Sequence, residues 1–220
     1  MFIGHFAPAF VAAALTPEKP RLGLMFIAAQ LVDWAFFAFV QLGIEHMRLS
    51  PGITAMNPMD LYHMPYTHSL LGSAAFAAGF ALLVWLATRD RLAAALSGAV
   101  VLSHWFLDLL VHAPDLTIAG DPPKLGLGLW RYPAIEMPLE LGLTFGALAF
   151  FLARTCGPGL PALTLAAVLL VLQGINWFGA QPEEVTPELA FMAAIGFALP
   201  TIAAWWLGRT RVGKSPAGLA

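Results

Sequence analysis

The chain has 220 residues, of which 59% are hydrophobic and only 11% are charged. A soluble globular domain carries about 25% charged residues, so this composition excludes an ordinary soluble protein and predicts an integral membrane protein. The formal net charge is −2 and no basic cluster is present, which argues against nucleic acid as a partner. The single cysteine excludes an internal disulfide and a metal site built from several thiolates.

Six apolar stretches are long enough to cross a bilayer, which takes about 20 helical residues. The expected helices cover 22–45, 70–88, 92–112, 135–154, 160–178 and 188–208. A stretch at 2–15 is too short to span comfortably and predicts a short first helix packed within the bundle. The polar connections fall at 16–21, 46–69 and 113–134. The expected fold is an all-α polytopic transmembrane helix bundle, a single membrane domain over 1–220 with six full helices and a short N-terminal segment.

Lysine and arginine favour cytoplasmic loops, and this rule orients the bundle. With the C-terminus inside and seven alternating segments, eight of the 11 basic residues fall on the inner side. The inner eight are Lys19, Arg21, Arg89, Arg91, Arg154, Arg209, Arg211 and Lys214, and the outer three are Arg48, Lys124 and Arg131. The expected topology is therefore N-out and C-in.

The stretch from Ser103 to Asp115 carries the strongest chemical signal. It places His104, Asp108 and His112 at i, i+4 and i+8, so their side chains stack on one face of the expected helix. Ionisable side chains inside a membrane are costly and need a partner or a wet cavity. Two imidazoles flanking a carboxylate predict a metal site. The alternative is a buried, hydrogen-bonded His–Asp pair that only ties helices together.

Further candidate ligands fall at the same level of the bundle. In the expected topology all six histidines lie at or toward the outer side, and Asp33 lies near mid-membrane. Imidazole and carboxylate donors without thiolate suit Zn, Mn or Fe. We expect a divalent metal, with zinc as the first candidate, bound by residues within 1–140, and the helices at 160–208 to be accessory. The expected ligands are His5, Asp33, His68, His104, Asp108 and His112.

Several residues around these ligands predict supporting roles. His68 is the expected ligand of the segment before the helix at 70–88, and His63 is expected to cap or hydrogen-bond within that loop. Thr67 or Ser69 is expected to cap the start of the helix. The polar side chains of 22–45 recur close to whole helical turns and predict one face turned into the bundle. They are Gln30, Asp33, Gln41 and Glu45.

The expected catalytic carboxylates are Asp108, Glu136 and Glu140. The two glutamates are expected to act as a general base or as partners of the metal ligands. Lys124 and Arg131 follow in the outer loop, where they are candidates to hold an anionic group such as phosphate. A solvated loop charge explains those two cations equally well.

Other chemistries lack their signals in the sequence. There is no P-loop, no dinucleotide-binding fingerprint and no nucleophile elbow. A retinal Schiff base needs a lysine within a helix, whereas Lys19, Lys124 and Lys214 all lie in expected loops or the tail.

Four motifs follow one another along the chain: Gly4-His5, Asp33, Thr67-His68-Ser69-Leu70-Leu71 and Ser103-His104-x3-Asp108. Over about residues 4–115 they resemble the YdjM-type inner-membrane metal-dependent hydrolases. The ligand order is also similar to that of zinc-dependent phospholipase C and related nucleases, which hydrolyse phosphoesters with three zinc ions. The resemblance implies a bacterial inner-membrane protein with an outward-facing site. It also implies His5, Asp33, His68, His104 and Asp108 as ligands, with Asp33 bridging metals.

The later His-x3-Glu of the phospholipases has no counterpart here, where only Glu136-x3-Glu140 lies nearby. The number of metal ions therefore stays open between one and three. The first aspartate also stands alone as Val32-Asp33-Trp34, whereas the YdjM-type proteins often carry a Pro-Asp-x-Asp run.

The expected function is hydrolysis of a phosphoester in a lipid or lipid-linked substrate by metal-activated water. Membrane lipids and this substrate are the expected partners, and the oligomeric state stays open. One alternative is a non-catalytic metal-binding or metal-transporting protein. Transport would need a polar route to the inner side, and that half of the sequence contains almost none. A further alternative is a structural membrane protein with hydrogen-bonded polar residues and no metal.

Overall fold

The computed structural model describes residues 1–16 and 21–214. Six of its helices are long and apolar enough to cross a membrane. They are α2 (Leu22–Gln41), α3 (Leu70–Thr88), α4 (Arg91–Val111), α5 (Pro133–Arg154), α6 (Gly159–Phe178) and α7 (Pro187–Arg209). The predicted all-α polytopic bundle is confirmed, and each predicted long helix is present, with ends that differ by a few residues at most.

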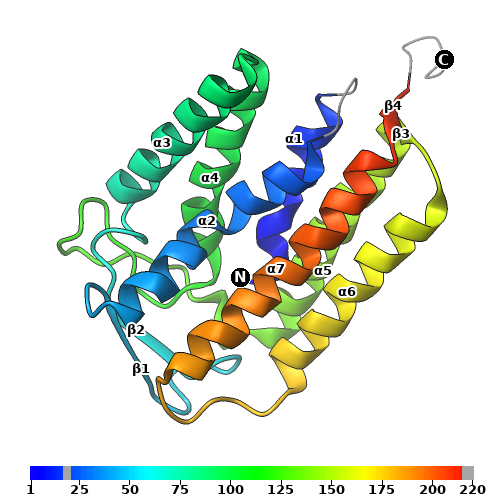
Figure 1. Ribbon diagram of the computed structural model, residues 1–220. Helices are drawn as coiled ribbons and strands as arrows, with labels where there is room; N and C mark the ends of the chain where they lie inside the picture. The colour runs from blue at the N-terminus through cyan, green and yellow to red at the C-terminus, as the bar shows by residue number, and fades with distance from the viewer. Residues whose placement is uncertain (17–20, 215–220) are drawn as a thin grey trace.

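The first segment is a 3-10 helix, η1 (Ile3–Phe6), that continues into the short helix α1 (Ala7–Ala14). These 12 residues are too few to cross a bilayer, as predicted. Helix α1 packs against α2, α4 and α5 in the middle of the bundle. Such a position suits a helix that is apolar all round, and Phe10 and Ala13 of α1 are fully buried. The chain thus begins inside the bundle, with Met1 buried, and runs to the end of the bundle that carries the turn after residue 88 (Figure 1).

The long helices alternate in direction between two ends of the bundle. One end carries the α3–α4 turn, the end of α1 and the α5–α6 connection. The other carries the α6–α7 loop and the hairpin of β1 and β2 (Figure 1). Helices α3 and α4 form one side, α5 to α7 form the other, and α2 packs on both α4 and α7 between them. This alternation is the one that the predicted topology requires.

The connections contain structure that the sequence did not predict. The predicted loop at 46–69 includes an antiparallel hairpin of β1 (His46–Leu49) and β2 (Met59–His63), in which His46 pairs with His63. A second pair, β3 (Thr155–Cys156) and β4 (Val212–Gly213), joins the start of the α5–α6 connection to the segment that follows α7. The loop at 113–134 contains the 3-10 helix η2 (Leu129–Arg131).

Helix α2 is shorter than predicted. It ends at Gln41 rather than at residue 45, because Gly43 adopts φ +68° and turns the chain away from the helix. Ser69 caps α3 by accepting a hydrogen bond from the Gly72 amide, as one of the two predicted alternatives required. The predicted turn at 16–21 lies mostly outside the described residues.

Opposite sidedness of the two ends is directly testable. Ser50 lies beside the β1–β2 hairpin, and the native Cys156 is exposed at the other end. A membrane-impermeant maleimide added outside intact cells should label Ser50→Cys in a Cys156→Ser background. It should label the native Cys156 only after permeabilisation. Labelling of both cysteines from the same side would disprove the topology.

Candidate metal centre

The six predicted ligands come together in one buried cluster. Asp108 of α4 lies at its centre, and the Nε2 atoms of four histidines surround its carboxylate. Asp108 Oδ1 lies 3.0 Å from His5 and 3.3 Å from His112. Asp108 Oδ2 lies 3.0 Å from His104 and 3.6 Å from His68. The four histidines come from η1, the turn before α3, and α4 with its C-terminal cap, so the fold closes the cluster from three separate segments.

Asp33 of α2 completes the cluster on the side of His68 and His104. Its Oδ1 lies 3.4 Å from the Nε2 atom of each of these histidines. Two overlapping groups of three donors therefore have ligand atoms within 4.8 Å of one another, a spacing that a bound metal ion could bridge. They are His5, His104 and Asp108, and Asp33, His68 and His104.

The protein backbone and a hydroxyl orient two of the rings. His104 Nδ1 lies 2.8 Å from the carbonyl oxygen of Ala29, which can only accept, so this nitrogen carries the proton. The hydroxyl of Thr67 donates its single proton to the Glu45 carboxylate and lies 2.9 Å from His68 Nδ1. It must therefore accept from that nitrogen. With the proton on Nδ1, the neutral form of each ring presents the lone pair of Nε2 to the cluster, which is the form in which histidine binds a metal.

A carboxylate orients a third ring. His112 Nδ1 lies 2.9 Å from Asp115 Oδ1, and its Nε2 faces Asp108. The indole of Trp130 packs on the same ring, with the two ring centroids 4.2 Å apart. Burial acts to lower the pKa of His112, but the carboxylates of Asp108 and Asp115 outweigh it and raise the pKa to about 9. The carboxylates thus make this position strongly attractive to a cation.

The cluster lacks the hydrogen bonds that a purely structural His–Asp tie would make. His5 Nε2, His104 Nε2 and Asp108 Oδ2 are buried, yet none has a hydrogen-bond partner among the described residues. His104 and Asp108 are close, at 3.0 Å, but their orientation is not that of a hydrogen bond. Buried polar atoms are nearly always paired, so these unpaired atoms, which face one another, could hold an ion between them. The other oxygen of Asp108, Oδ1, accepts a hydrogen bond from the amino group of Met1, at 3.2 Å.

A cavity of about 340 Å³ reaches one side of the cluster. Small-molecule sites usually have volumes of about 300–1,000 Å³, and this cavity falls within that range. Four predicted ligands line it: Asp33, His68, Asp108 and His112. A larger groove of about 650 Å³ lies along α1, α4 and α5, but its lining contains no titratable side chain. The smaller cavity is therefore the one that gives access to the chemistry.

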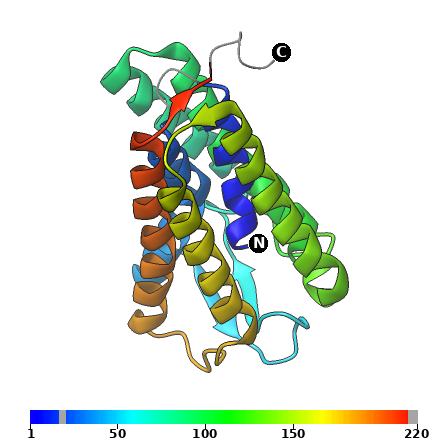
Figure 2. The same ribbon diagram turned by 90° about the vertical axis from the view of Figure 1, so that its right-hand side faces the viewer.

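Glu140 of α5 has a different surrounding from the metal ligands. One of its oxygens accepts hydrogen bonds from the amides of Phe2 and Gly4, and the other accepts from the side chain of Gln173, at 2.8 Å. Gln30 of α2 donates to the Phe2 carbonyl, at 3.2 Å. The first amides of η1 lack helical partners, and the bundle interior offers little water. Three helices, α2, α5 and α6, thus hold the segment that carries His5. The 3-10 helix η1 packs on α2, α4 and α5, and Figure 2 shows the N-terminus near the middle of the bundle.

Glu136 lies one turn before Glu140 and is fully buried. Neither of its carboxylate oxygens has a hydrogen-bond partner in the described part of the chain. The Glu136 carboxylate therefore has no partner among the described residues, whereas both oxygens of Glu140 accept hydrogen bonds.

The remaining predicted residues lie away from the cluster. Lys124 is exposed and donates to the carbonyl of Tyr62, at 2.7 Å. Arg131 is exposed at the end of η2. Neither side chain lines the cavity, and a role in holding an anion stays a prediction. His63 pairs with His46 in the hairpin, outside the cluster.

Sequence reasoning missed the groups that orient the rings. Asp115 stands three residues after His112, a spacing that could have indicated a partner at the end of a helix. Thr67 was expected only as a helix cap, and Glu45 only as part of the polar face at 22–45. The hydrogen bonds between Glu45 and Thr67, which fix the hydroxyl that orients His68, join residues 22 positions apart, for which the sequence has no local signal.

No protein-family model, no curated protein and no solved structure matches this chain. The resemblance to YdjM-type hydrolases is accordingly carried by the sequence motifs alone. The chain is a polytopic helical membrane protein with a buried His/Asp cluster that could hold a metal ion.

Proposed function

We propose that this protein is a membrane-embedded, metal-dependent hydrolase that cleaves a phosphoester. The observation that carries the proposal is the orientation of the cluster. Three rings bind protein groups through Nδ1 and present Nε2 to Asp108, and a cavity reaches the ligands from one side. Catalytic metal sites keep such an open side for water and substrate.

The donor set supports zinc, with manganese or iron as alternatives, because it combines imidazole and carboxylate without thiolate. Asp108 has one oxygen toward His5 and His112 and the other toward His68 and His104. Asp108 would therefore be the ligand shared by the two pairs of histidines, whereas the sequence resemblance implied Asp33 as the shared ligand. The residues on the two sides of Asp108 would hold one or two ions.

In hydrolysis, a bound divalent ion supplies Lewis acidity and lowers the pKa of water. The protein's own groups provide the rest of the chemistry. The buried cluster keeps the ligands rigid, and the apolar cavity excludes bulk water from them. Glu136 is the proposed general base because its buried carboxylate makes no hydrogen bond among the described residues, and a movement of the side chain would have to bring it into the cavity, which it does not line. Glu140 is proposed to position His5, because hydrogen bonds occupy both its oxygens.

A metal transporter is less well supported. The cluster is separated from the inner end by a packed apolar core, in which the fully buried rings of Phe6 and Phe10 both pack on the buried ring of Phe26. An ion would need a polar route through this core. The excess of basic residues at that end supports an outward-facing site in a bacterial cytoplasmic membrane.

The function can be tested with bis(p-nitrophenyl) phosphate and protein purified in detergent. Zinc- or manganese-loaded protein should hydrolyse this phosphodiester, chelation should abolish turnover, and added metal should restore it. Glu136→Gln should lower turnover by about 10²–10⁴-fold, the usual contribution of a general base, with metal content unchanged. Metal-loaded protein without turnover on any phosphoester would make the site a non-catalytic metal-binding centre.

A further inference from the structure

We infer that the cavity beside the cluster binds the single apolar chain of an amphiphilic phosphoester that enters from the bilayer. This inference rests on the proposed function for the polar end of the ligand only. The cavity has two chemically distinct parts, a polar floor of metal ligands and an apolar wall. The wall residues are Phe36 and Phe37 of α2, Leu172 and Ile175 of α6, and Met192, Ile195 and Phe197 of α7.

The wall lies at the depth of acyl chains. Helix α7 begins at Pro187, and each helical residue advances about 1.5 Å. Met192 and Phe197 therefore lie about 7 and 15 Å along the helix from its outer end. The apolar core of a bilayer is about 30 Å thick, so both residues fall within the half of the core next to that end.

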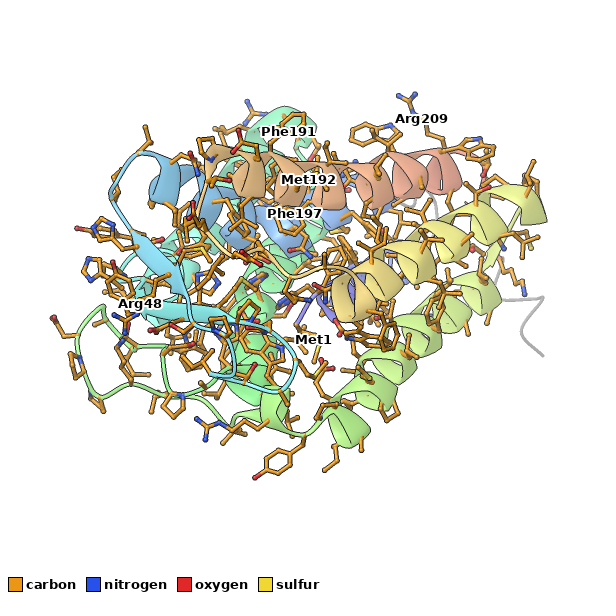
Figure 3. The ribbon with its side chains drawn as sticks, turned by 90° about the horizontal axis from the view of Figure 1, so that it is seen from below. Met1, Arg48, Phe191, Met192, Phe197 and Arg209 are labelled. Carbon is orange, nitrogen blue, oxygen red and sulfur yellow. The ribbon has the colours of Figure 1, made fainter. Side chains whose placement is uncertain are left out.

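The same wall is not sealed by protein. Ile175 is 58% exposed and Met192 is 62% exposed, although both line the cavity. The neighbouring wall positions Ala193 and Gly196 are small and leave room between the larger side chains. In Figure 3, Met192 and Phe197 lie on α7, and Met1 lies near the centre of the bundle. A chain lying in the surrounding bilayer can therefore reach the ligands sideways.

The charges of the lining identify the polar end of the ligand. None of the described residues that line the cavity is a lysine or an arginine, whereas Asp33 and Asp108 contribute carboxylates. The lining also includes the amino group of Met1, 3.2 Å from Asp108 Oδ1, and two histidines. Bound metal ions would add the further positive charge that holds an anionic headgroup beside these carboxylates. The apolar wall, in contrast, attracts a hydrocarbon chain whether or not metal is bound. The two halves of the site thus select an amphiphile with a phosphate next to a chain.

The test compares two substrates with the same reacting group, ethyl and dodecyl p-nitrophenyl phosphate, using protein in lipid nanodiscs. The wild type should hydrolyse the dodecyl ester with a kcat/KM at least about tenfold higher than the ethyl ester, because the chain adds apolar contacts. Met192→Trp places a larger side chain on the wall and narrows the cavity. It should lower kcat/KM for the dodecyl ester by at least about tenfold, while kcat/KM for the ethyl ester changes by less than about twofold.

Phe191→Trp is the matched control. Phe191 immediately precedes Met192 on α7 and is 66% exposed, but it does not line the cavity. It should leave both substrates unchanged. Equal rates for both esters in the wild type, or a proportional loss for both in Met192→Trp, would overturn the inference. Binding of radiolabelled dodecyl phosphate to zinc-loaded protein separates the two proposals. Binding that Met192→Trp weakens, without hydrolysis of either ester, would retain the chain site and reject the hydrolase.

Discussion

Replacing Asp108 with asparagine should remove metal from the protein and abolish hydrolysis while the bundle stays folded. Asp108 is the only described side chain that lies within 3.6 Å of all four ring Nε2 atoms. Asparagine has the same shape, so packing is preserved, but it lacks the charge that binds a divalent ion. Loss of a residue that only hydrogen-bonds to a metal ligand usually lowers metal affinity by about 10–100-fold. We expect a larger loss here, because Asp108 is itself a proposed ligand.

The matched control for this substitution is Asp121→Asn, which changes an exposed loop carboxylate in the same way. It should leave metal content and turnover unchanged. Metal content is measured by elemental analysis, and folding by size-exclusion chromatography and circular dichroism in detergent. An Asp108→Asn protein that keeps both the wild-type metal content and the wild-type turnover would remove Asp108 from the site. One that binds metal but loses turnover would make Asp108 a catalytic group rather than a ligand.

Glu140→Gln should weaken metal binding about 10–100-fold through His5, without a direct contact to the ion. Glutamine has one acceptor oxygen, and it cannot serve the Phe2 and Gly4 amides and the Gln173 side chain together. At least one hydrogen bond to a charged acceptor is lost, which costs about 1.5–3 kcal/mol of stability. The segment that carries His5 then loses its fixed position against α5.

A double-mutant cycle distinguishes positioning from catalysis. In a His5→Ala background, Glu140→Gln should cost little further metal affinity, whereas its cost in thermal stability should persist. Thr144→Ala is the control, since Thr144 is buried one turn further along α5 and bonds only the Glu140 carbonyl. If Glu140→Gln instead abolishes turnover with metal affinity intact, Glu140 acts as a base and the positioning role is wrong.

The features that could be predicted from the sequence are those set by local periodicity. Apolar length predicted all six spans, and the four-residue spacing of His104, Asp108 and His112 placed three ligands on one stripe. His112 in fact lies just past the last helical residue of α4, at ψ 147°, and still reaches Asp108. Asp33 could be singled out because a carboxylate amid apolar residues at mid-membrane is costly without a partner.

The features that could not be predicted depend on contacts between distant segments. Glu140 was expected to act as a general base or as a partner of the metal ligands, and its hydrogen bonds with the amides of Phe2 and Gly4 favour the second role. No sequence feature near position 140 indicates these hydrogen bonds. The pairing of Thr67 with Glu45 likewise depends on how α2 ends, which Gly43 determines. The central place of Asp108 in the cluster follows from the packing of η1 and α2 on α4, not from spacing along the chain.

The most direct test of a metal centre is inductively coupled plasma mass spectrometry of the purified protein, with the wild type beside His104→Ala. His104 belongs to both donor groups, so its loss should disable the whole cluster. Our account predicts one or more equivalents of zinc, manganese or iron in the wild type, and none in the variant. Absence of metal from both proteins, even after reconstitution, would mean that the histidines and aspartates only hold the helices together.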